Sequence, residues 1–582
     1  MASLPGAFFE KGRSFLPCLF NSFDPYFKQP FGAVRAGQSV HLSLCIPEEL
    51  GYVDPHLVLQ KEGRYDVPVH YRMKFDGQTP HQNHFSVDVT LNDVGLYFYY
   101  FDLYTDFRRI VRGPDNCGVV SWQEGESWQI TVYEADFETP APIKGKVFYQ
   151  IFPDRFCEGV ENKPMPFPDR LYQADKHAEP FWQPNEVGGH LNEDYFGGDL
   201  KGIQMKLPYL RKMGVDYLYL NPIFEAHSNH RYNTADYLNV DPLLGTNEDF
   251  ETLCAEARKY GIGIVLDGVF SHTGSDSRYF NREGRYGEGG VIDTWLRRGA
   301  AGFRLDVADE LPDEFIEKVR TAVKRVGPDK FLLGEVWEDA TTKFGFDKRR
   351  TYLLGKGLDS VMNYPFKNAV LGFVCGRDAG QTMTDILSIC EHYPAPALDT
   401  ALNFLSTHDT ERALTVIADE PANGRGREWQ SGRCVTGDAY EEGMLKLRMA
   451  YAIIYTLPGV PCLYYGDEIG MQGYRDPFNR GFYCWDSHEE RLKPVLAQLA
   501  QLRHTCEAFR TGELRVLRAE GGVLHYQRIG EFEAAEIIVN RTEHIIVEPL
   551  ASGKHTEVNP MGFTIVVEEV GHNPNHSYYD YK

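Results

Sequence analysis

The sequence lacks an excess of positive charge and lacks a long uninterrupted apolar run. It has 60 Lys and Arg residues against 83 Asp and Glu, which gives a net charge of −23. That balance argues against nucleic acid or an anionic membrane as the main partner, because both attract cationic proteins. The most apolar stretch, Met449 to Tyr465, is broken by Pro458, Gly459 and Pro461, so it is not a membrane span.

Cysteine frameworks and several catalytic motifs are also missing. The 11 cysteines are scattered and form no C-x-x-C pair, which favours a reduced intracellular chain over a disulfide-stapled one. Met1 to Phe20 contains no apolar core of a signal peptide, so a cytoplasmic location is expected. No H-E-x-x-H, P-loop, G-x-S-x-G or clustered Cys/His spacing occurs. The sequence therefore gives no indication of the enzyme classes and metal sites that depend on those motifs.

The composition that remains is that of a globular protein with many aromatic side chains. Hydrophobic residues make up 42% and charged residues 25% of the 582 positions, and this length predicts about three to five domains. Aromatic residues reach 13%, with 34 tyrosines. Tyr and Trp suit flat, hydroxyl-covered ligands such as sugars, because each offers an apolar face and a polar edge. Aromatic-rich β-sandwich cores would explain the same excess equally well.

Residues 1–135 are expected to form a β-sandwich. Apolar and polar residues alternate over Ser39–Ile46 and over Phe85–Leu91, which places one face of each strand in a core. Leu96–Tyr104 and Trp128–Tyr133 are two further strand candidates, and short strands separated by turns are typical of a sandwich. The Pro-containing segment Glu134–Lys144 then reads as a linker.

Residues 136–508 are expected to form a (β/α)₈ TIM barrel, an α/β fold. Eight short apolar strands alternate there with amphipathic helices such as Asn247–Tyr260 and Pro312–Val326, which is the strand count of that barrel. A doubly wound open sheet is the alternative, weakened by the absence of a Gly-rich phosphate loop after the first strand. The expected strands are Val147–Phe152, Tyr217–Leu220, Ile262–Asp267, Phe303–Val307, Phe331–Glu335, Val361–Tyr364, Leu402–Leu405 and Pro461–Tyr465.

Residues 509–582 are expected to form a smaller C-terminal β-sandwich. Its candidate strands are Leu524–Ile529, Glu536–Asn540, Ile545–Val547 and Phe563–Glu568.

Charged side chains follow several barrel strands at their carboxyl ends, where this fold places catalytic groups. Each one alone is better read as a helix cap or a solvated loop residue. Three apolar strands that each end in a carboxylate at one rim are harder to explain in this way. Unpaired charges there cost free energy, so their presence together indicates a functional site. The residues are Asp267 and His272 after the third strand, Arg304 and Asp306 after the fourth, Glu335 after the fifth, and His408 and Asp409 after the seventh.

Two of these carboxyl groups are expected to differ in pKa. Arg304 and Asp306 are two residues apart on one strand and point to the same side, so the cation should keep Asp306 ionised. Glu335 has no basic neighbour in sequence, and apolar surroundings such as Trp337 would raise its pKa. An ionised and a protonated carboxyl group in one cleft is the arrangement that glycoside hydrolysis needs.

With these four blocks in order, the chain resembles the retaining α-glycoside hydrolases of the α-amylase family. It is most similar to the branch of neopullulanase, maltogenic amylase and cyclomaltodextrinase, and the resemblance covers nearly the whole chain. It implies that Asp306 is the nucleophile, that Glu335 is the acid/base, and that Asp409 stabilises the transition state.

The resemblance also implies a set of substrate-binding residues. Asp476 and Arg480 match a late loop that lines the −1 subsite, although a surface ion pair worth less than about 1 kcal/mol is the plain alternative. Trp337 stands where the branch carries an aromatic for the acceptor sugar, with packing at the rim as its alternative. The remaining matches to the −1 subsite are Tyr232, Asp267, His272, Arg304 and His408.

Three departures from the family pattern stand out. Asn233 replaces the usual aspartate in Tyr-Asp-Thr, which changes a subsite contact from charge to amide. No cofactor is expected to be required, and calcium is left open with Asp199 as a candidate oxygen ligand. The insert that family members carry after the third barrel strand is absent, so residues near Gly287–Gly290 are expected to be missing, and Val291–Arg298 must supply the helix.

The expected activity is hydrolysis of α-1,4 glucosidic bonds in malto-oligosaccharides, cyclodextrins, pullulan or starch, with α-1,6 bonds left open. Double displacement requires the Asp306 and Glu335 carboxyl groups to lie about 5–5.5 Å apart. A transglycosylase or an α-glucosidase on the same scaffold is the first alternative, and a non-catalytic carbohydrate-binding protein is the second. The resemblance further implies a starch-binding type of N-terminal domain that builds a homodimer.

Overall fold

The computed structural model describes residues 18–63, 68–105, 107–161, 163, 170–183, 192–271, 279 and 290–570. The chain divides into two compact units. The first comprises Met1–Ala135, Glu531–Ala534 and Val567–Lys582, and the second comprises Asp136–Gly530 and Ala535–Val566. The expected three-domain boundaries therefore stay a prediction. Among the described residues, no helix is long and apolar enough to cross a membrane.

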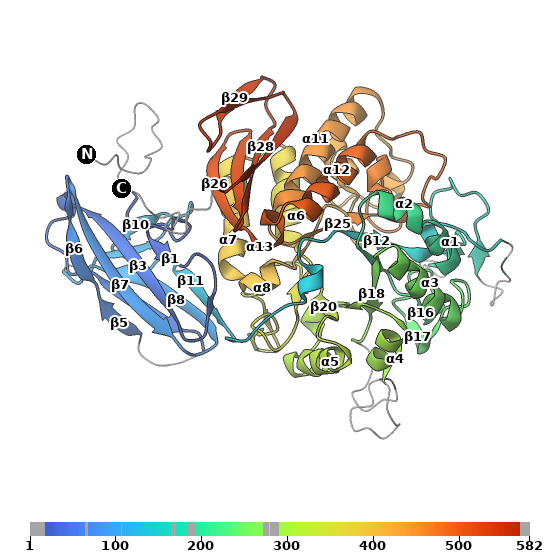
Figure 1. The fold of residues 1–582 in the computed structure, drawn as a ribbon, viewed down its shortest axis with the longest axis horizontal. Coiled ribbons are helices and arrows are strands. Elements are labelled where there is room, and N and C mark those ends of the chain that lie inside the picture. Colours follow the sequence, from blue (N-terminus) through green and yellow to red (C-terminus); the bar gives the residue numbers. More distant parts are fainter. Residues whose placement is uncertain are drawn as a thin grey trace. The chain divides into compact units, whose positions relative to one another are not determined.

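The first unit is built from two β-sheets (Figure 1). The four expected strands are present as β3 (Gln38–Pro47), β7 (Gln82–Leu91), β8 (Gly95–Asp102) and β11 (Trp128–Tyr133). In the β3–β7 ladder, Leu42 pairs with Val87 and Leu44 with Phe85, so the apolar faces coincide. The sheet orders are β1-β3-β7-β6 and β10-β9-β8-β11-β2, with β4 pairing β5 and β8.

Seven further strands of this unit were not predicted, because their sequences show no clear alternation of apolar and polar residues. They are short or partly exposed, and Phe75, for example, lies outside the core. Their bounds are β1 Lys28–Gln29, β2 Val34–Arg35, β4 His56–Lys61, β5 Val69–Arg72, β6 Lys74–Thr79, β9 Arg109–Arg112 and β10 Gly118–Ser121.

The second unit contains the predicted barrel. Eight strands form one parallel sheet in the order β23-β20-β19-β18-β15-β12-β25-β24, and a parallel bridge between Met362 and Leu402 joins its two ends. This closure excludes the open doubly wound sheet. The strands are β12 Phe148–Ile151, β15 Tyr217–Leu220, β18 Gly263–Gly268, β19 Gly302–Leu305, β20 Phe331–Gly334, β23 Ser360–Val361, β24 Leu402–Phe404 and β25 Val460–Tyr464.

Helices pack around the strands, with α3 (Asn247–Lys259) on β18, α5 (Asp313–Val326) on β20 and α11 (Gly437–Thr456) on β25. α3 begins at a capping box in which Thr246 accepts from the Asp249 backbone N–H and Asp249 returns the contact. The others are α1 Leu200–Met205, α2 Leu207–Lys212, α4 Val291–Arg298, α6 Tyr364–Val374, α7 Ala379–His392, α8 Ala395–Leu398, α9 Ala413–Ala418, α10 Arg427–Gln430, α12 Leu492–Thr505 and α13 Ala508–Thr511.

Small strand pairs and a C-terminal β region complete the chain. The C-terminal sheet has the order β26-β27-β28-β31, and a separate pair β29-β30 packs Val558 with Ile538 and Leu550. The bounds are β26 Glu513–Glu520, β27 Val523–Ile529, β28 Glu533–Asn540, β29 Ile546–Pro549, β30 His555–Val558 and β31 Gly562–Glu569. Within the barrel region they are β13 Leu171–Tyr172, β14 Asp194–Tyr195, β16 Phe224–Ala226, β17 Thr234–Val240, β21 Phe344–Gly345 and β22 Lys348–Arg349.

Candidate active site

One buried arginine gathers three carboxyl groups at the carboxyl ends of adjacent strands. Arg304 Nη1 lies 2.8 Å from Asp267 Oδ1 and 2.8 Å from Asp306 Oδ1, while Nη2 lies 2.9 Å from Glu335 Oε2. The order β18-β19-β20 explains this meeting, since neighbouring parallel strands end at the same rim. The sequence predicts that these four residues lie together at one rim, and the structure shows that they do.

The backbone after Asp306 is turned so that it supports Glu335. Val307 has φ 43° and ψ 55°, a left-handed conformation that a β-branched residue rarely adopts. In this conformation the Val307 N–H donates to Glu335 Oε2 over 2.9 Å. Such strain persists only where surrounding structure holds it, and it is common at functional sites.

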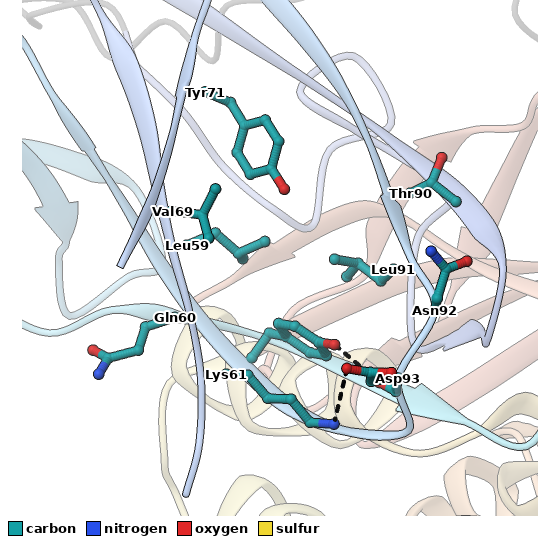
Figure 2. Close-up of a pocket in the computed structure, with 10 residues that line it drawn as sticks. Leu59, Gln60, Lys61, Val69, Tyr71, Thr90, Leu91, Asn92 and Asp93 are labelled. Atoms are coloured by element: carbon teal, nitrogen blue, oxygen red, sulfur yellow. Dashed lines mark hydrogen bonds and ion pairs between the residues drawn. The ribbon is translucent and has the colours of Figure 1, made fainter. Parts of the chain in front are cut away.

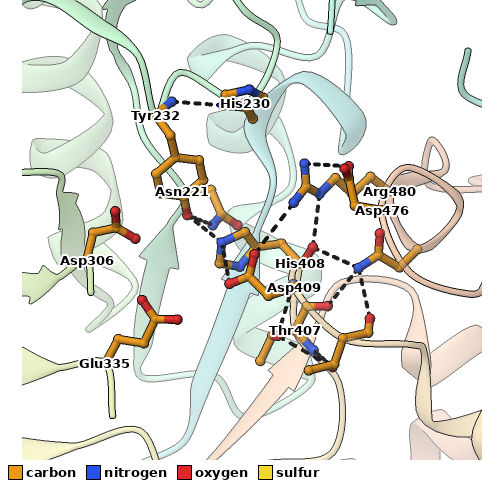
Figure 3. Close-up of polar contacts among 12 residues, drawn as sticks. Asn221, His230, Tyr232, Asp306, Glu335, Thr407, His408, Asp409, Asp476 and Arg480 are labelled. Atoms are coloured by element: carbon orange, nitrogen blue, oxygen red, sulfur yellow. Dashed lines mark hydrogen bonds and ion pairs between the residues drawn. The ribbon is translucent and has the colours of Figure 1, made fainter. Parts of the chain in front are cut away.

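A second group of residues faces the first across the same space. Figure 3 shows Asp306 and Glu335 on one side, with Tyr232, His408 and Asp409 on the other. Tyr232 donates its hydroxyl to Asp267 Oδ2 over 2.8 Å and stacks on the His408 ring at 5.4 Å and 9°. This contact links the two groups into one site.

The His408 ring is neutral, and its surroundings assign its proton. Burial lowers the pKa of His408 well below its usual value. Gln150 Nε2 lies 2.9 Å from His408 Nδ1 and can only donate, so Nδ1 accepts. The ring proton therefore sits on Nε2, which lies 3.0 Å from Asp409 Oδ2. The hydrogen-bond partner of His408 Nε2 is the Tyr232 hydroxyl, so the neutral ring donates to Tyr232 and lies beside Asp409.

Arg480 and Asp476 belong to the same network. Arg480 Nη1 lies 2.7 Å from Asp476 Oδ1, Nη2 lies 3.6 Å from Asp409 Oδ1, and Nε donates to the His408 carbonyl over 3.0 Å (Figure 3). Arg480 is only 8% exposed, which distinguishes this contact from a surface ion pair. Their role toward a substrate stays a prediction.

Trp337 contacts the acid/base candidate through its polar edge. Its indole N–H donates to Glu335 Oε1 over 2.9 Å, and its ring stacks on Tyr364 at 4.3 Å and 14°. The indole is still 44% exposed, so one part of it faces solvent at the rim. Both readings of the sequence are therefore compatible with its position, because it packs at the rim and presents an aromatic surface.

The expected division of charge between the two central carboxyl groups is wrong. Burial raises the pKa of Asp306 to about 7, against the opposing effect of Arg304. Burial also acts on Glu335, but Arg304 and the Val307 and Trp337 N–H groups outweigh it and lower its pKa below the usual value. The reason is tertiary: Arg304 reaches Glu335 from the neighbouring strand at 2.9 Å, and Trp337 meets Glu335 with its N–H instead of an apolar face.

The Asp306 carboxyl group also helps to lower the pKa of Glu335. Asp306 therefore titrates near pH 7, and a proton held by the pair rests on Asp306 and not on Glu335. Asp409 is similar, since burial raises its pKa to about 6 although Arg480 opposes the change. The site therefore stores protons on carboxyl groups near pH 7.

Several contributing residues were not picked out from the sequence. Tyr219 donates to Asp267 Oδ2 over 2.8 Å, and Asn221 donates to the Tyr232 hydroxyl over 3.0 Å. His230 accepts from the Tyr232 backbone N–H over 3.0 Å. Gln150, Tyr219 and Asn221 lie in or directly after strands β12 and β15, where a barrel places its functional groups. Their position could have pointed to them, but their uncharged side chains did not distinguish them from packing residues.

Some expectations fall on other parts of the chain. His272 and residues 281–289, which include Gly287, lie outside the described residues, so the expected gap and the role of His272 stay predictions. The separation of the Asp306 and Glu335 carboxyl groups also stays a prediction. Asn233 accepts a hydrogen bond from Ser228 Oγ over 2.5 Å, so its amide oxygen is already engaged.

Asp199 does not offer open oxygens to a cation. It caps α1 by accepting from the Gly202 backbone N–H, and it also accepts from Gly159 over 3.1 Å and Val160 over 2.9 Å. Lys163 Nζ lies 2.5 Å from Asp199 Oδ2, so an ammonium group already supplies the positive charge. Within the described ranges, no cluster of His, Cys, Asp and Glu has the geometry of a metal site.

A cavity of about 280 Å³ lies in the first unit, and none of the predicted site residues lines it (Figure 2). Leu59, Val69 and Leu91 form its apolar wall, and Tyr71 and Tyr97 line it as well. Lys61 and Asp93 lie across it at 3.8 Å, and the Tyr97 hydroxyl donates to the Asp93 carbonyl over 3.0 Å. These polar groups are satisfied internally.

Comparison with known proteins agrees with this geometry. The alpha amylase catalytic domain family matches residues 150–289 and 285–511, which together cover most of the chain and all described residues of the site. The chain belongs to the alpha-amylase family. The two matched segments meet at 285–289, the place at which the sequence suggests a missing insert.

The relatives are in the branch expected from the sequence. Cyclomaltodextrinase from Geobacillus thermopakistaniensis is 31% identical over 71% of this chain and 72% of its own length. Cyclic alpha-maltosyl-(1→6)-maltose hydrolase from Arthrobacter globiformis is 28% identical and superimposes with a TM-score of 0.62 over 74% of this chain and 100% of that chain.

Amylopullulanase from Thermoanaerobacter thermohydrosulfuricus is 30% identical over 87% of this chain. The chain spans only 31% to 46% of the length of the amylopullulanases that it matches.

The shared proton leads to a prediction that needs no substrate. We expect the Trp337 indole N–H resonance to titrate with a midpoint near pH 7, because its acceptor Glu335 responds when the pair loses its proton. In Asp306→Asn the step should vanish, since Glu335 alone stays ionised through this range. Proton–nitrogen spectra of Trp-labelled protein measure this, with the exposed Trp122 as internal control. A flat Trp337 signal in the wild type across neutral pH contradicts the shared proton.

Proposed function

We propose that the chain is a retaining glycoside hydrolase that cleaves α-1,4 glucosidic bonds in malto-oligosaccharides, cyclodextrins, pullulan or starch. The observation that carries the proposal is the carboxyl pair Asp306 and Glu335, which Arg304 contacts at 2.8 Å and 2.9 Å. Retaining hydrolysis needs one carboxylate nucleophile and one protonated acid in reach of the same bond. A pair that already holds one proton needs only to move it from Asp306 to Glu335.

In this mechanism substrate binding drives that internal proton transfer. A sugar placed against the site displaces solvent and brings the glycosidic oxygen to Glu335, which then keeps the proton and donates it to the leaving group. Asp306, now a carboxylate stabilised by Arg304 at 2.8 Å, attacks the anomeric carbon. Water next hydrolyses the glycosyl-enzyme, with Glu335 as the base that removes its proton.

The opposite wall binds the sugar. Asp409 presents a carboxylate toward the space between the two walls, where sugar hydroxyls can donate to it, and His408 holds the Tyr232 hydroxyl in place. Tyr232 lies stacked on His408 and supplies a flat surface for the ring of the sugar. Arg480 holds Asp409 in place through its contact at 3.6 Å. The names of the relatives, which include cyclomaltodextrinase and amylopullulanase, support an α-glucan as substrate.

Transglycosylation is the second candidate, and the rim position of Trp337 favours it. An exposed indole beside the acid/base offers a stacking surface to an acceptor sugar that competes with water. Cleavage of α-1,6 bonds is supported by the name of the Arthrobacter globiformis hydrolase, whose substrate contains such a bond. The complete set Asp306, Glu335 and Asp409 argues against a non-catalytic binding protein.

Product analysis tests these proposals together. With starch, pullulan, β-cyclodextrin and maltotriose in parallel, we expect α-anomeric products by proton NMR, because two inversions give net retention. Products longer than the substrate on maltotriose would identify transglycosylation. Asp306→Asn should lower kcat by at least about 10³-fold with an unchanged melting temperature. Turnover by that variant close to the wild-type rate, or β-anomeric first products, contradicts the proposed roles.

We propose that the enzyme needs no calcium at Asp199, because Lys163 takes the place of a cation. Its ammonium group also donates to the Gly197 carbonyl over 2.7 Å and is nearly buried. EDTA and added Ca²⁺ should therefore leave the melting temperature unchanged. Lys163→Met should lower stability by about 3 kcal/mol, because it leaves Asp199 unpaired. Lys201→Met, an exposed lysine on α1, is the matched control. Destabilisation of the wild type by EDTA contradicts the proposal.

We further propose a cytoplasmic homodimer formed through the first unit. One relative, from Bacillus subtilis, is named an intracellular maltogenic amylase. Tyr52, Phe107 and Trp122 in the first unit are 81%, 89% and 65% exposed, so these aromatic side chains are open to a partner. Sedimentation equilibrium should give twice the chain mass, and Phe107→Ser should weaken the dimer. A monomer at micromolar concentration contradicts it.

A further inference from the structure

Two cysteine thiols of the first unit lie in contact although they are far apart in sequence. Cys18 Sγ lies 3.1 Å from Cys117 Sγ, although the two residues are 99 positions apart along the chain. Cys18 is exposed and Cys117 is half-buried, so reagents in solution can reach the pair.

Backbone pairing, and not only a side-chain rotamer, brings these thiols together. The segment that follows Cys18 runs beside β10: the Gly118 N–H donates to the Phe20 carbonyl over 2.7 Å, and Asn21 forms an antiparallel bridge with Cys117. Asn116 Nδ2 donates to Asn21 Oδ1 over 2.9 Å and fixes the same register. The approach of the two sulfur atoms is therefore set by the fold of the unit.

A third thiol, Cys45, is near but is held in a different environment. It is 6% exposed, and its Sγ lies 3.3 Å from His84 Nδ1 and 3.5 Å from the Tyr26 hydroxyl. Burial raises the pKa of this thiol, which makes it a poor nucleophile at neutral pH. Cys18 differs, because the hydrogen bond with Cys117 lowers its pKa. The reactive end of the pair is thus Cys18.

We propose that Cys18 and Cys117 form a dithiol that closes to a disulfide on reaction with a small disulfide oxidant such as glutathione disulfide. The Cys18 thiolate attacks one sulfur of the oxidant, forms a mixed disulfide and releases one glutathione thiolate. Cys117 then loses its proton, attacks Cys18 Sγ and releases the second glutathione. One oxidant is reduced to two thiols for each protein disulfide formed, so electrons and protons balance.

The disulfide would act on the stability of the first unit. It would close a loop of about 100 residues that spans most of the strands of that unit, and cross-linking a loop of this length removes much conformational freedom from the unfolded chain. It would also add a covalent link to the bridge and the hydrogen bonds that now hold the segment at Asn21 to β10. The pair therefore couples the redox state of the surroundings to the stability of this unit.

The test exposes the full-length protein to glutathione buffers of increasing oxidised fraction and then blocks the remaining thiols. Trypsin places Cys18, Cys45 and Cys117 on the separate peptides 14–28, 36–61 and 113–144, so the linkage can be read by mass spectrometry without reduction. We expect a 14–28 to 113–144 link, loss of two thiols, and a rise of about 5 °C in the melting temperature of the first unit.

Single variants make the result decisive. Cys18→Ser and Cys117→Ser should each abolish the link and the rise in melting temperature, whereas Cys375→Ser, which removes an exposed thiol of the second unit, should behave as the wild type. The proposal is overturned if both thiols stay free in strongly oxidising buffer. A stable glutathione adduct on Cys18 alone, or a link from Cys18 to Cys45, overturns it as well.

Discussion

The active site depends on one buried guanidinium group. Arg304 is fully buried and carries its positive charge under all conditions in which the protein is folded, so its three carboxylate neighbours are held around a fixed charge. One cation cannot balance three buried carboxylates. Two features stabilise the excess negative charge. The Tyr219 and Tyr232 hydroxyls donate to Asp267, and the Asp306–Glu335 pair can hold a proton. The acid needed for glycoside cleavage is therefore a consequence of an unequal charge count.

The barrel fold brings these charged residues together with few requirements on the sequence. Strands β18, β19 and β20 are neighbours in a closed parallel sheet, so each needs to end in only one or two charged residues to form the cluster. Val307 then turns its N–H toward Glu335 through a conformation that the sequence alone would disfavour. The free energy of the packed barrel holds this local strain, which is why it can persist next to the reacting groups.

The eight barrel strands were predictable because each is a short apolar run whose neighbours are amphipathic helices, and the carboxylates were predictable from the ends of those runs. Strands such as β5 and β6 were not, since their side chains are partly exposed and carry no alternation. Within the site, Tyr219 and Asn221 were not predicted, because an uncharged residue at a strand end cannot be distinguished by sequence from a residue that only packs in the core.

By itself the sequence determined the fold class, the family and which carboxyl groups share one rim, because these follow from the order of residues along strands. Only the tertiary structure decided where the proton rests. That depends on which edge of Trp337 meets Glu335 and on where the Val307 N–H points, and both are set by packing among segments distant in sequence. The contact of Cys18 with Cys117 has the same origin, since strand pairing brings together residues that no local pattern connects.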